Sequence, residues 1–392
     1  MSLHSEKYDV AIVGGGPAGS SLAIRLSMAG LSVVLVEQKK FPREKLCGEF
    51  ISPECLPHFS ELGVMPAITA ANGTDLAETI FFARNGKGVS VRSEWFGKAD
   101  SMALGLSRAE MDERLIVRAR YLGVEVCEET NAVGLIMVED NVRGVKTRDK
   151  NGEETEIQAT VTVDATGRSR SLVRRLDKRI PAKKPARFVA FKTHLSKARI
   201  KPGACEIYAY RGGYGGCNRV ENDLYNLCFI ASAKDTKGLN SDPERVLRKV
   251  VFTNKRAAKA MGNAEVAKPW LAVPVERFGR GDLVPASGLL TVGDSAAFID
   301  PFTGSGILLA LESSKIAAHA VKENLRDFDQ LVVDYKTNYS AAFDRRLRVC
   351  SMLRHAAFVP FLAEGTISVL GLSSGLRRRI ARSTRFSAES GV

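Results

Sequence analysis

Three glycines near the N-terminus have the spacing of a turn that binds a diphosphate. Gly14, Gly16 and Gly19 follow the apolar run of residues 8–13. Gly14 permits a tight turn, Gly16 lets the backbone approach a pyrophosphate, and Gly19 lets the next helix pack closely on the strand. The amides and the positive dipole end of that helix would meet the phosphate charge. The pattern predicts a dinucleotide site that includes Gly14, Gly16, Pro17, Ala18 and Gly19.

An acidic residue follows the second apolar run, at the spacing that such a site requires. Residues 31–36 have the pattern of a buried strand, and Glu37 and Gln38 come directly after it. A carboxylate at this position accepts hydrogen bonds from both hydroxyls of an adenosine ribose, and it repels a 2′-phosphate. We therefore expect FAD or NAD(H), and not NADP(H), with Glu37 and Gln38 in the binding site.

Cys47 is the strongest candidate for catalysis. It lies in the loop of residues 41–49 between Arg43, Lys45 and Gly48, and neighbouring cations favour the thiolate form of a cysteine. The thiol would act as a proton donor or position a substrate. The alternative is that a small residue is needed where the loop passes the cofactor. Arg43, Cys47 and Gly48 are expected near the cofactor in both cases.

Further segments distinguish a flavin from a nicotinamide nucleotide. Asp294 follows a buried strand, where its carboxylate would reach a ribityl hydroxyl. The run of residues 301–306 opens a helix whose bare amides face an anion, and reduced flavin is anionic at the pyrimidine end of its ring. Arg108 would supply a cation on the polar side of the cofactor. FAD is therefore predicted, with contacts from Arg108, Gly293, Asp294, Gly304, Ser305 and Gly306.

The elements that must position these residues alternate between strands and helices. Residues 8–13, 31–36 and 160–163 are expected in one nucleotide sheet, and a helix capped by Ser107 is expected over residues 109–121. A β-rich stretch after residue 187 suits a second sheet that covers a substrate, followed by a helix near residues 243–261. The predicted FAD-binding domain is discontinuous (1–75, 100–175 and 272–340), with a substrate domain (76–99 and 176–271) and a basic helical C-terminal region (341–392).

The composition is that of a globular protein with excess positive charge. Of 392 residues, 45% are hydrophobic and 26% are charged, and the net charge is +13. The sequence has no apolar leader and no uncharged apolar run of about 18 residues. Seven cysteines without a C-x-x-C pair fit reduced thiols. We expect a cytoplasmic protein.

Two basic clusters, at residues 168–187 and 377–385, call for an explanation. No nucleic-acid-binding pattern accompanies them, so nucleic acid is not expected as a partner. The scattered histidines lack metal-ligand spacing, and no metal is expected. The C-terminal cluster follows apolar runs at residues 358–362 and 367–370, a combination that favours peripheral contact with an anionic membrane. A solvated basic surface is the alternative.

Three ordered motifs resemble the flavoprotein superfamily of para-hydroxybenzoate-type hydroxylases, flavin halogenases and geranylgeranyl reductases. They are the N-terminal glycine turn, the Asp-Ala-Thr-Gly run at residues 164–167, and Gly-Asp at 293–294 with the Pro-x-x-Gly-x-Gly run at 301–306. Residues 41–49 are most similar to the Phe-Pro-Arg-(Asp/Glu)-Lys-x-Cys-Gly segment of geranylgeranyl-reductase-like proteins. The resemblance implies an α/β (α+β) fold, in which a Rossmann-like FAD-binding domain carries an inserted antiparallel β-sheet substrate domain and a helical C-terminus. Asp164 would either touch FAD or hold its own turn.

The chain departs from two patterns within this superfamily. Residues 208–216 lack the Trp and Phe-Pro of the reductases' Tyr-x-Trp-x-Phe-Pro segment, so this segment does not support a polyprenyl substrate. The Trp-x-Trp-x-Ile-Pro signature of halogenases is also absent, because Trp95 and Trp270 are far apart. Halogenation is therefore not expected. Tyr208, Tyr210 and Tyr214 would either line the substrate cavity or belong to the core.

The sequence predicts an FAD-dependent oxidoreductase that acts on an apolar organic molecule. Its motifs favour hydride transfer from reduced FAD to a carbon–carbon double bond, with Cys47 or water as the proton source. One alternative is a monooxygenase that hydroxylates an aromatic or polyketide-like substrate through a C4a-hydroperoxyflavin; another is a non-enzymatic flavoprotein or electron carrier. A single glycine turn predicts that the reductant, NAD(P)H or a protein donor, binds only transiently. The oligomeric state is left open.

Overall fold

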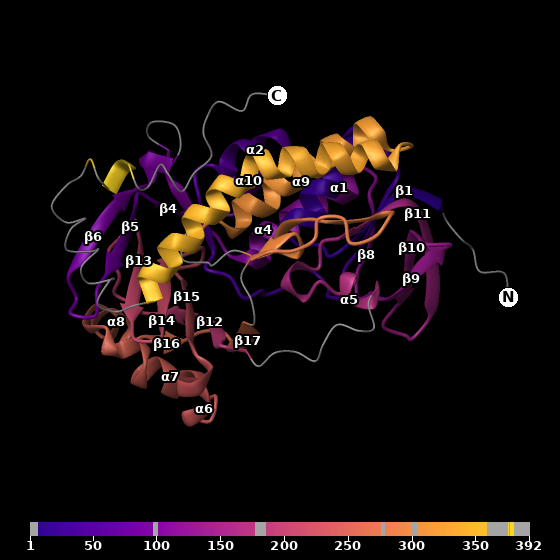
Figure 1. Ribbon diagram of the computed structural model, residues 1–392. Helices are drawn as coiled ribbons and strands as arrows, with labels where there is room; N and C mark the ends of the chain where they lie inside the picture. Colours follow the sequence, from indigo (N-terminus) through magenta and orange to yellow (C-terminus); the bar gives the residue numbers. More distant parts are fainter. Residues whose placement is uncertain are drawn as a thin grey trace.

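The computed structural model describes residues 7–96, 101–176, 186–275, 279–298, 304–358, 375 and 377–379. Two large β-sheets lie side by side in this part of the chain, and long helices cover the first of them (Figure 1). The first sheet carries the glycine turn. The second sheet faces the turn across the site described below.

The first sheet has the parallel centre that the sequence predicts. Strand β1 (Lys7–Val13) pairs in parallel with β2 (Val33–Val36) and with β11 (Glu154–Asp164). β11 also pairs in parallel with β19 (Leu289–Thr291). The apolar character of β1, β2 and β19 is typical of parallel strands covered on both faces. The order β8-β2-β1-β11-β10-β9 is completed by β8 (Glu125–Cys127), β10 (Asn141–Arg148) and β9 (Asn131–Val138).

Helices from three parts of the chain pack over this sheet. α1 (Pro17–Met28) starts with proline, whose missing N–H costs nothing in a first turn. α4 (Arg108–Tyr121) starts after Ser107, whose hydroxyl accepts a hydrogen bond from Glu110 N, so the predicted cap is confirmed. α1 packs against α4 and α9 (Gly306–Asn324), and α10 (Phe328–Phe358) packs on α9. Figure 1 shows α9 and α10, in orange and yellow, running side by side.

The second sheet joins two segments that are far apart in the sequence. β5 (Glu78–Phe82) pairs in parallel with β13 (Ala204–Tyr210), so purple and pink strands meet in Figure 1. All other pairings in this sheet are antiparallel. The order β16-β12-β15-β14-β13-β5-β6, with β17 on β12, adds β6 (Gly88–Arg92), β12 (Phe188–Ser196), β14 (Gly213–Arg219), β15 (Tyr225–Ser232), β16 (Glu265–Val266) and β17 (Leu271–Val275).

One face of the second sheet packs on short helices, which leaves its other face available to the site. Val246, Ala257 and Met261 from these helices join Phe191 and Phe229 from the sheet in one buried cluster. The single helix expected near residues 243–261 is wrong, because the Asn254 side chain caps a second helix and so interrupts the first. The helices are α6 (Ala233–Gly238), α7 (Pro243–Lys249) and α8 (Lys255–Met261).

Short elements complete the described part of the chain. β3 (Phe50–Ile51) and β4 (Thr74–Leu76) both pair with β7 (Ala103–Gly105), next to the loop that carries Cys47. α10 is continuous through residue 341, where a separate C-terminal region was expected to start. Among the described residues, no helix is both long and apolar enough to cross a membrane. The remaining short helices and strands are α2 (Cys55–Glu61), α3 (Met65–Thr69), α5 (Val173–Leu176), β18 (Gly279–Arg280) and β20 (Ala297–Phe298).

Candidate active site

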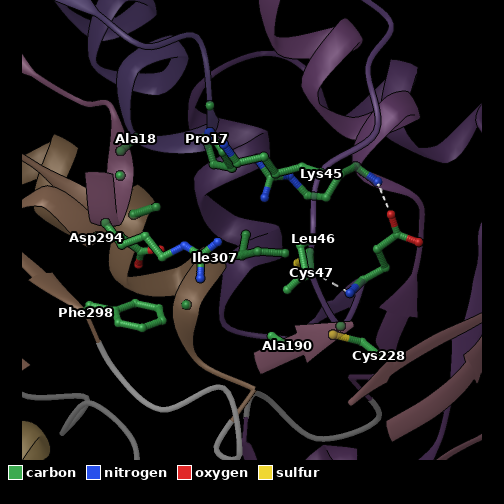
Figure 2. A pocket seen from close by; sticks show the side chains of 18 of the residues that line it. Pro17, Ala18, Lys45, Leu46, Cys47, Ala190, Cys228, Asp294, Phe298 and Ile307 are labelled. Atoms are coloured by element: carbon green, nitrogen blue, oxygen red, sulfur yellow. Dashed lines mark hydrogen bonds between the residues drawn. The ribbon is translucent and has the colours of Figure 1, made fainter. Parts of the chain in front are cut away.

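A cavity of about 970 Å³ lies between the two sheets and collects most of the predicted cofactor contacts. The glycine turn and the end of β2 form one side, and the second sheet forms the opposite wall. Figure 2 shows Pro17, Lys45, Cys47 and Asp294 around this space. The predicted contacts that line it are Gly14, Gly16, Pro17, Ala18, Glu37, Gln38, Arg43, Cys47, Gly48, Arg108, Asp294, Gly304 and Gly306.

The glycine turn is packed too closely for side chains at two of its positions. Gly14 has φ +109°, and a Cβ there would lie 2.4 Å from a backbone oxygen just after β11. A Cβ at Gly19 would lie 1.9 Å from Gly14 O. A Cβ at Gly16 would have the guanidinium nitrogens of Arg108 and Arg43 as its nearest neighbours, at 3.6 and 4.0 Å. The turn thus leaves an open position beside two cations, which suits a diphosphate.

Three of the predicted cofactor contacts do not line the cavity but lie behind the residues that do. Besides Gly19, these are Gly293, where a Cβ would lie 2.8 Å from Ala18 Cβ, and Ser305, the buried N-cap of α9. Asp164 also acts from behind. Its buried carboxylate accepts hydrogen bonds from the backbone of residues 166 and 172 and from Ser295 Oγ, at 2.9–3.0 Å. Of the two roles considered for Asp164, the structure shows that it holds the turn.

Asp112 is a site residue that the sequence analysis missed. It is buried on α4, and it accepts hydrogen bonds from Arg108 Nε at 2.8 Å and from Arg43 Nη1 at 3.0 Å. Burial alone would lower the pKa of Arg108, but the neighbouring Asp112 carboxylate outweighs burial and raises it. Asp112 therefore fixes both guanidiniums beside Gly16. The only sequence signal was the i,i+4 spacing of Arg108 and Asp112.

Glu37 lies at the end of β2 and is buried, as expected, but protein donors already use much of its carboxylate. Oε2 accepts from Gly15 N at 2.9 Å and from Arg43 Nη2 at 3.3 Å, and Oε1 accepts from Lys39 N at 3.0 Å. A carboxylate has about four acceptor positions, so about one is left for a ribose hydroxyl. The sequence predicts that Glu37 accepts hydrogen bonds from both ribose hydroxyls, but this arrangement leaves room for about one.

Positive charge is in excess in the centre of the cavity. Burial, reinforced by repulsion from Arg43, Arg108 and Arg168, lowers the pKa of Lys45. Burial also raises the pKa of Asp294 to about 6, against the attraction of the nearby cations. A bound anion would relieve the repulsion around Lys45. Lys45 and Arg168 therefore belong to the candidate site, although they were not among the predicted contacts.

In the FAD-free protein, Asp294→Asn is expected to increase the free energy of unfolding above pH 6. Folding raises the pKa of Asp294 from 3.8 to about 6. The contribution of Asp294 to the free energy of unfolding is therefore complete below pH 3.8, and it is lost as the pH rises through about 6. This difference corresponds to roughly 3 kcal/mol at pH 7. Urea unfolding at pH 4 and pH 7 measures it. The exposed Asp140→Asn is the control, and parallel pH profiles for both variants would contradict the prediction.

Cys47 is half-buried in the cavity, with donors on its sulfur. Its Sγ accepts a hydrogen bond from Glu49 N at 3.4 Å, and the Arg108 guanidinium is within hydrogen-bonding reach of it. The carbonyl oxygen of Cys47 accepts from Asn226 Nδ2 at 3.2 Å, which ties this loop to β15 of the second sheet. Figure 2 shows Cys47 and Cys228 facing the same space.

A buried ion cluster lies beside Cys47, and sequence analysis did not predict it. Lys192 Nζ donates to Glu49 Oε1 at 2.5 Å and to Glu44 Oε2 at 2.8 Å, and His194 Nε2 lies 2.7 Å from Glu49 Oε2. Burial alone would lower the pKa of Lys192, but the two carboxylates raise it. Ligand atoms of Glu44, Glu49 and His194 lie within 4.8 Å of one another, as a metal site would require. The Lys192 ammonium, however, already bonds to both carboxylates.

The wall formed by the second sheet is largely apolar. Phe81, Ile207, Tyr214 and Ile230 line the cavity there. Tyr208 and Tyr210 instead belong to the buried core, where the Tyr210 hydroxyl donates to Ile230 O at 2.9 Å. One side of the cavity is thus charged and the other apolar. It suits a charged nucleotide beside an apolar substrate.

These residues fit FAD. The space beside Gly16, the acid at the end of β2 and the crowded cations match the diphosphate and ribose of a dinucleotide. α9 starts at Gly306, and Gly304 and Gly306 line the cavity, so backbone amides at the start of this helix are available to the cofactor as well.

Comparison with known proteins shows the family. Residues 7–327 match the family model described as an FAD binding domain, so the chain belongs to this family and is an FAD-dependent oxidoreductase. The digeranylgeranylglycerophospholipid reductase of Methanosarcina mazei is 30% identical over 342 residues, which are 85% of this chain and 80% of that protein. Within the family, the chain is thus geranylgeranyl-reductase-like, which confirms the resemblance stated from its motifs.

Solved structures share the fold. A flavin-dependent brominase has a TM-score of 0.80 at 21% identity, covering 98% of this chain and 96% of that one. A geranylgeranyl bacteriochlorophyll reductase-like protein from Thermoplasma acidophilum has a TM-score of 0.77 at 20% identity, covering 96% of both chains. The same architecture therefore occurs in a halogenase and in a reductase-like protein, and the fold alone does not select the reaction.

Proposed function

We propose that this oxidoreductase reduces a carbon–carbon double bond in an apolar, lipid-like molecule. The observation that carries the proposal is the position of Cys47, in the cavity between the charged nucleotide side and the apolar wall. Its sulfur has an arginine and a backbone N–H as neighbours, which suits a group that gives up a proton. The name of the Methanosarcina mazei relative supports a substrate with geranylgeranyl chains.

The charged side of the cavity would hold the cofactor. The glycine turn and Arg43 and Arg108 would hold the diphosphate of FAD, and Glu37 would hold its adenosine end. Bound and reduced, FAD supplies a hydride. Asp112 keeps the two arginines in place before the cofactor arrives, so little ordering is needed on binding.

The apolar wall and Cys47 would act on the substrate. Phe81, Ile207 and Ile230 would exclude water from the double bond. When one carbon of that bond receives a hydride, the Cys47 thiol gives a proton to the other carbon, and the sulfur keeps the electron pair of its S–H bond. Arg108 and Glu49 N–H stabilise the resulting thiolate, and a solvent proton restores the thiol.

A single turnover without oxygen tests this function. The FAD-loaded protein is reduced chemically, freed of excess reductant and mixed with a lipid that carries geranylgeranyl chains. We expect the absorbance of oxidised flavin to return, and mass spectrometry to show the addition of H₂ to a double bond. If the absorbance returns only after oxygen is admitted and the product gains an oxygen atom, the protein is a monooxygenase and the proposal is wrong.

We further propose that the reductant visits the cavity only transiently. NAD(P)H or a reduced protein carrier is the candidate, since the sequence contains a single turn of the Gly14–Gly19 type. The rate at which NADH, NADPH or a reduced carrier protein bleaches the bound flavin identifies the donor. Saturation of that rate with a nicotinamide nucleotide would support direct binding.

We also propose that exposed arginines near the C-terminus contact anionic lipid. Arg377 donates to Ser90 O on β6 and lines the cavity, whereas Arg378 and Arg379 are exposed. Such a contact would bring the cavity near a substrate dissolved in a bilayer. The apolar runs at residues 358–362 and 367–370, Arg382 and Arg385 lie outside the described residues, apart from the backbone of residue 358.

Replacing Arg378 and Arg379 with glutamate is expected to weaken binding to anionic vesicles at least about tenfold, because each basic residue near such a surface contributes about 1 kcal/mol. Co-sedimentation at low salt measures the effect, with neutral vesicles as the control. Absence of binding by the unaltered chain, or equal binding by both proteins, would remove the proposal.

A further inference from the structure

A row of small and apolar residues crosses the second sheet on the side of the cavity. Each residue in the row pairs with the next across neighbouring strands, and all of them line the cavity; they are Cys228 (β15), Gly216 (β14), Ile207 (β13), Phe81 (β5) and Val89 (β6). The row, called the cross-strand row below, leads from the thiol of Cys228 to β6, the last strand on that side of the sheet (Figure 1).

The cross-strand row has the length and the surface of a site for an extended hydrocarbon chain. Neighbouring strands lie about 4.8 Å apart, so the four steps from β15 to β6 span roughly 19 Å. An extended chain advances about 1.25 Å per carbon, because its C–C bonds of about 1.5 Å form a zigzag, and roughly 15 carbons would therefore span the row. A Cβ at Gly216 would lie 3.0 Å from Ile207 Cδ1, so the glycine keeps the row open between Cys228 and Ile207.

A cation with an unused donor lies at the far end of the cross-strand row. Arg377 lines the cavity, and its Nη1 donates to Ser90 O of β6, next to Val89, at 2.9 Å. Its Nε is buried and has no hydrogen-bond partner among the described residues. A buried N–H without a partner costs free energy, and an anion beside the guanidinium would supply that partner.

We propose that Arg377 binds the anionic group of a long amphiphile whose chain lies along the cross-strand row. The chain crosses the sheet from Val89 to Cys228. It thereby presents to Cys47, which faces the same space as Cys228, a double bond roughly 15 carbons from the anionic group. The inference deepens the proposed function, on which it rests, because it adds the orientation, the length and the charge of the substrate.

Binding of saturated alkyl phosphates to the FAD-bound full chain tests the length of the site. The probes run from hexyl to octadecyl phosphate below their micelle concentrations, and equilibrium dialysis with radiolabelled probes measures the affinity. We expect the affinity to rise about fourfold with each methylene, as for burial of a CH₂ group, and to level off at roughly 15 carbons. An affinity that does not depend on length, or that rises unchanged to octadecyl phosphate, would overturn the inference.

Gly216→Leu places an obstacle in the row, three strand steps from Val89. The affinity should then level off at roughly 11 carbons, since three steps span roughly 14 Å. Gly238→Leu is the control, because a Cβ at Gly238 would meet nothing within 4 Å, and its series should match that of the unaltered chain. An unchanged end point in Gly216→Leu would contradict the inference. Should this variant fail to fold, Ile207→Trp blocks the row one step nearer Val89 and should stop the rise at a shorter chain.

Arg377→Gln tests the charge of the ligand. The unaltered chain should bind dodecyl phosphate at least about tenfold more tightly than dodecanol, as for a hydrogen bond to a charged group, and Arg377→Gln should remove this preference. Arg378→Gln is the matched control, because Arg378 is exposed and the change in net charge is the same. Equal preferences in the two variants would overturn the assignment of Arg377.

Inorganic phosphate distinguishes a head group on a chain from a free anion. Because it has no chain to bury, it should displace dodecyl phosphate only at concentrations at least about 10²-fold higher than dodecyl phosphate itself requires. Displacement at similar concentrations would show a site for the free anion, and the inference would be wrong.

The saturated probes cannot be reduced, so their binding does not depend on the reaction. A wrong proposal about the reaction would leave the dependence on length and charge intact. A wrong inference about the row and Arg377 would remove that dependence and leave the single-turnover test unaffected.

Discussion

Cys47→Ser is expected to lower turnover by about 10²-fold or more, the range typical of a lost general acid. Serine is nearly isosteric with cysteine, and its oxygen can accept the hydrogen bond from Glu49 N in place of the sulfur. It is a far weaker acid, so the proton would no longer be delivered. FAD content and melting temperature should barely change, because no packing contact is lost. Single-turnover rates with the reduced protein measure the effect.

Cys228→Ser is the matched control, because Cys228 also lines the cavity but lies on β15 of the second sheet. Turnover in this variant should stay within about threefold of the unaltered protein, since a near-isosteric change at a lining residue removes no acid. A Cys47→Ser variant as active as Cys228→Ser would leave Cys47 only the role of a small residue beside the cofactor.

Gly19→Ala is expected to abolish measurable FAD binding and to lower stability. The new Cβ would lie 1.9 Å from Gly14 O, and no real contact is that short, so α1 must move away from the turn. Moving α1 removes the amides and the dipole that meet the diphosphate. The expected loss in affinity exceeds about 10²-fold, because several charge-assisted hydrogen bonds are lost together. Flavin content after purification and titration of FAD into the deflavinated protein measure it.

Gly238→Ala is the control for this substitution. Gly238 is the last residue of α6, and a Cβ there would meet nothing within 4 Å. In a helix, alanine is favoured over glycine by about 1 kcal/mol, so stability should rise slightly or stay unchanged. Full FAD affinity in Gly19→Ala would show that the turn and α1 can separate without loss of the site.

The sequence by itself determined the nucleotide half of this protein. The tight turn at Gly14, the close approach at Gly19 and the acid at Glu37 are requirements of the local backbone. They therefore appear as residue types at fixed spacings, and they could be interpreted without a tertiary structure. The parallel pairing of β1 with β2 and β11 follows from the same apolar runs, and the cap at Ser107 is likewise local. The cofactor class is a consequence of this half.

Only the tertiary structure decided which charges meet. Lys192 and Glu49 are 143 positions apart, and their contact depends on how β12 lies against the Cys47 loop. Asp112 joins Arg43 across 69 positions in the same way, whereas its pairing with Arg108 lies within α4. A charged residue in a sequence resembles any solvated one until packing removes water from it and supplies its partner. The left-handed backbone of Glu49, with φ +51°, has no signal in its residue type, because the distant cluster, and not a glycine, stabilises it.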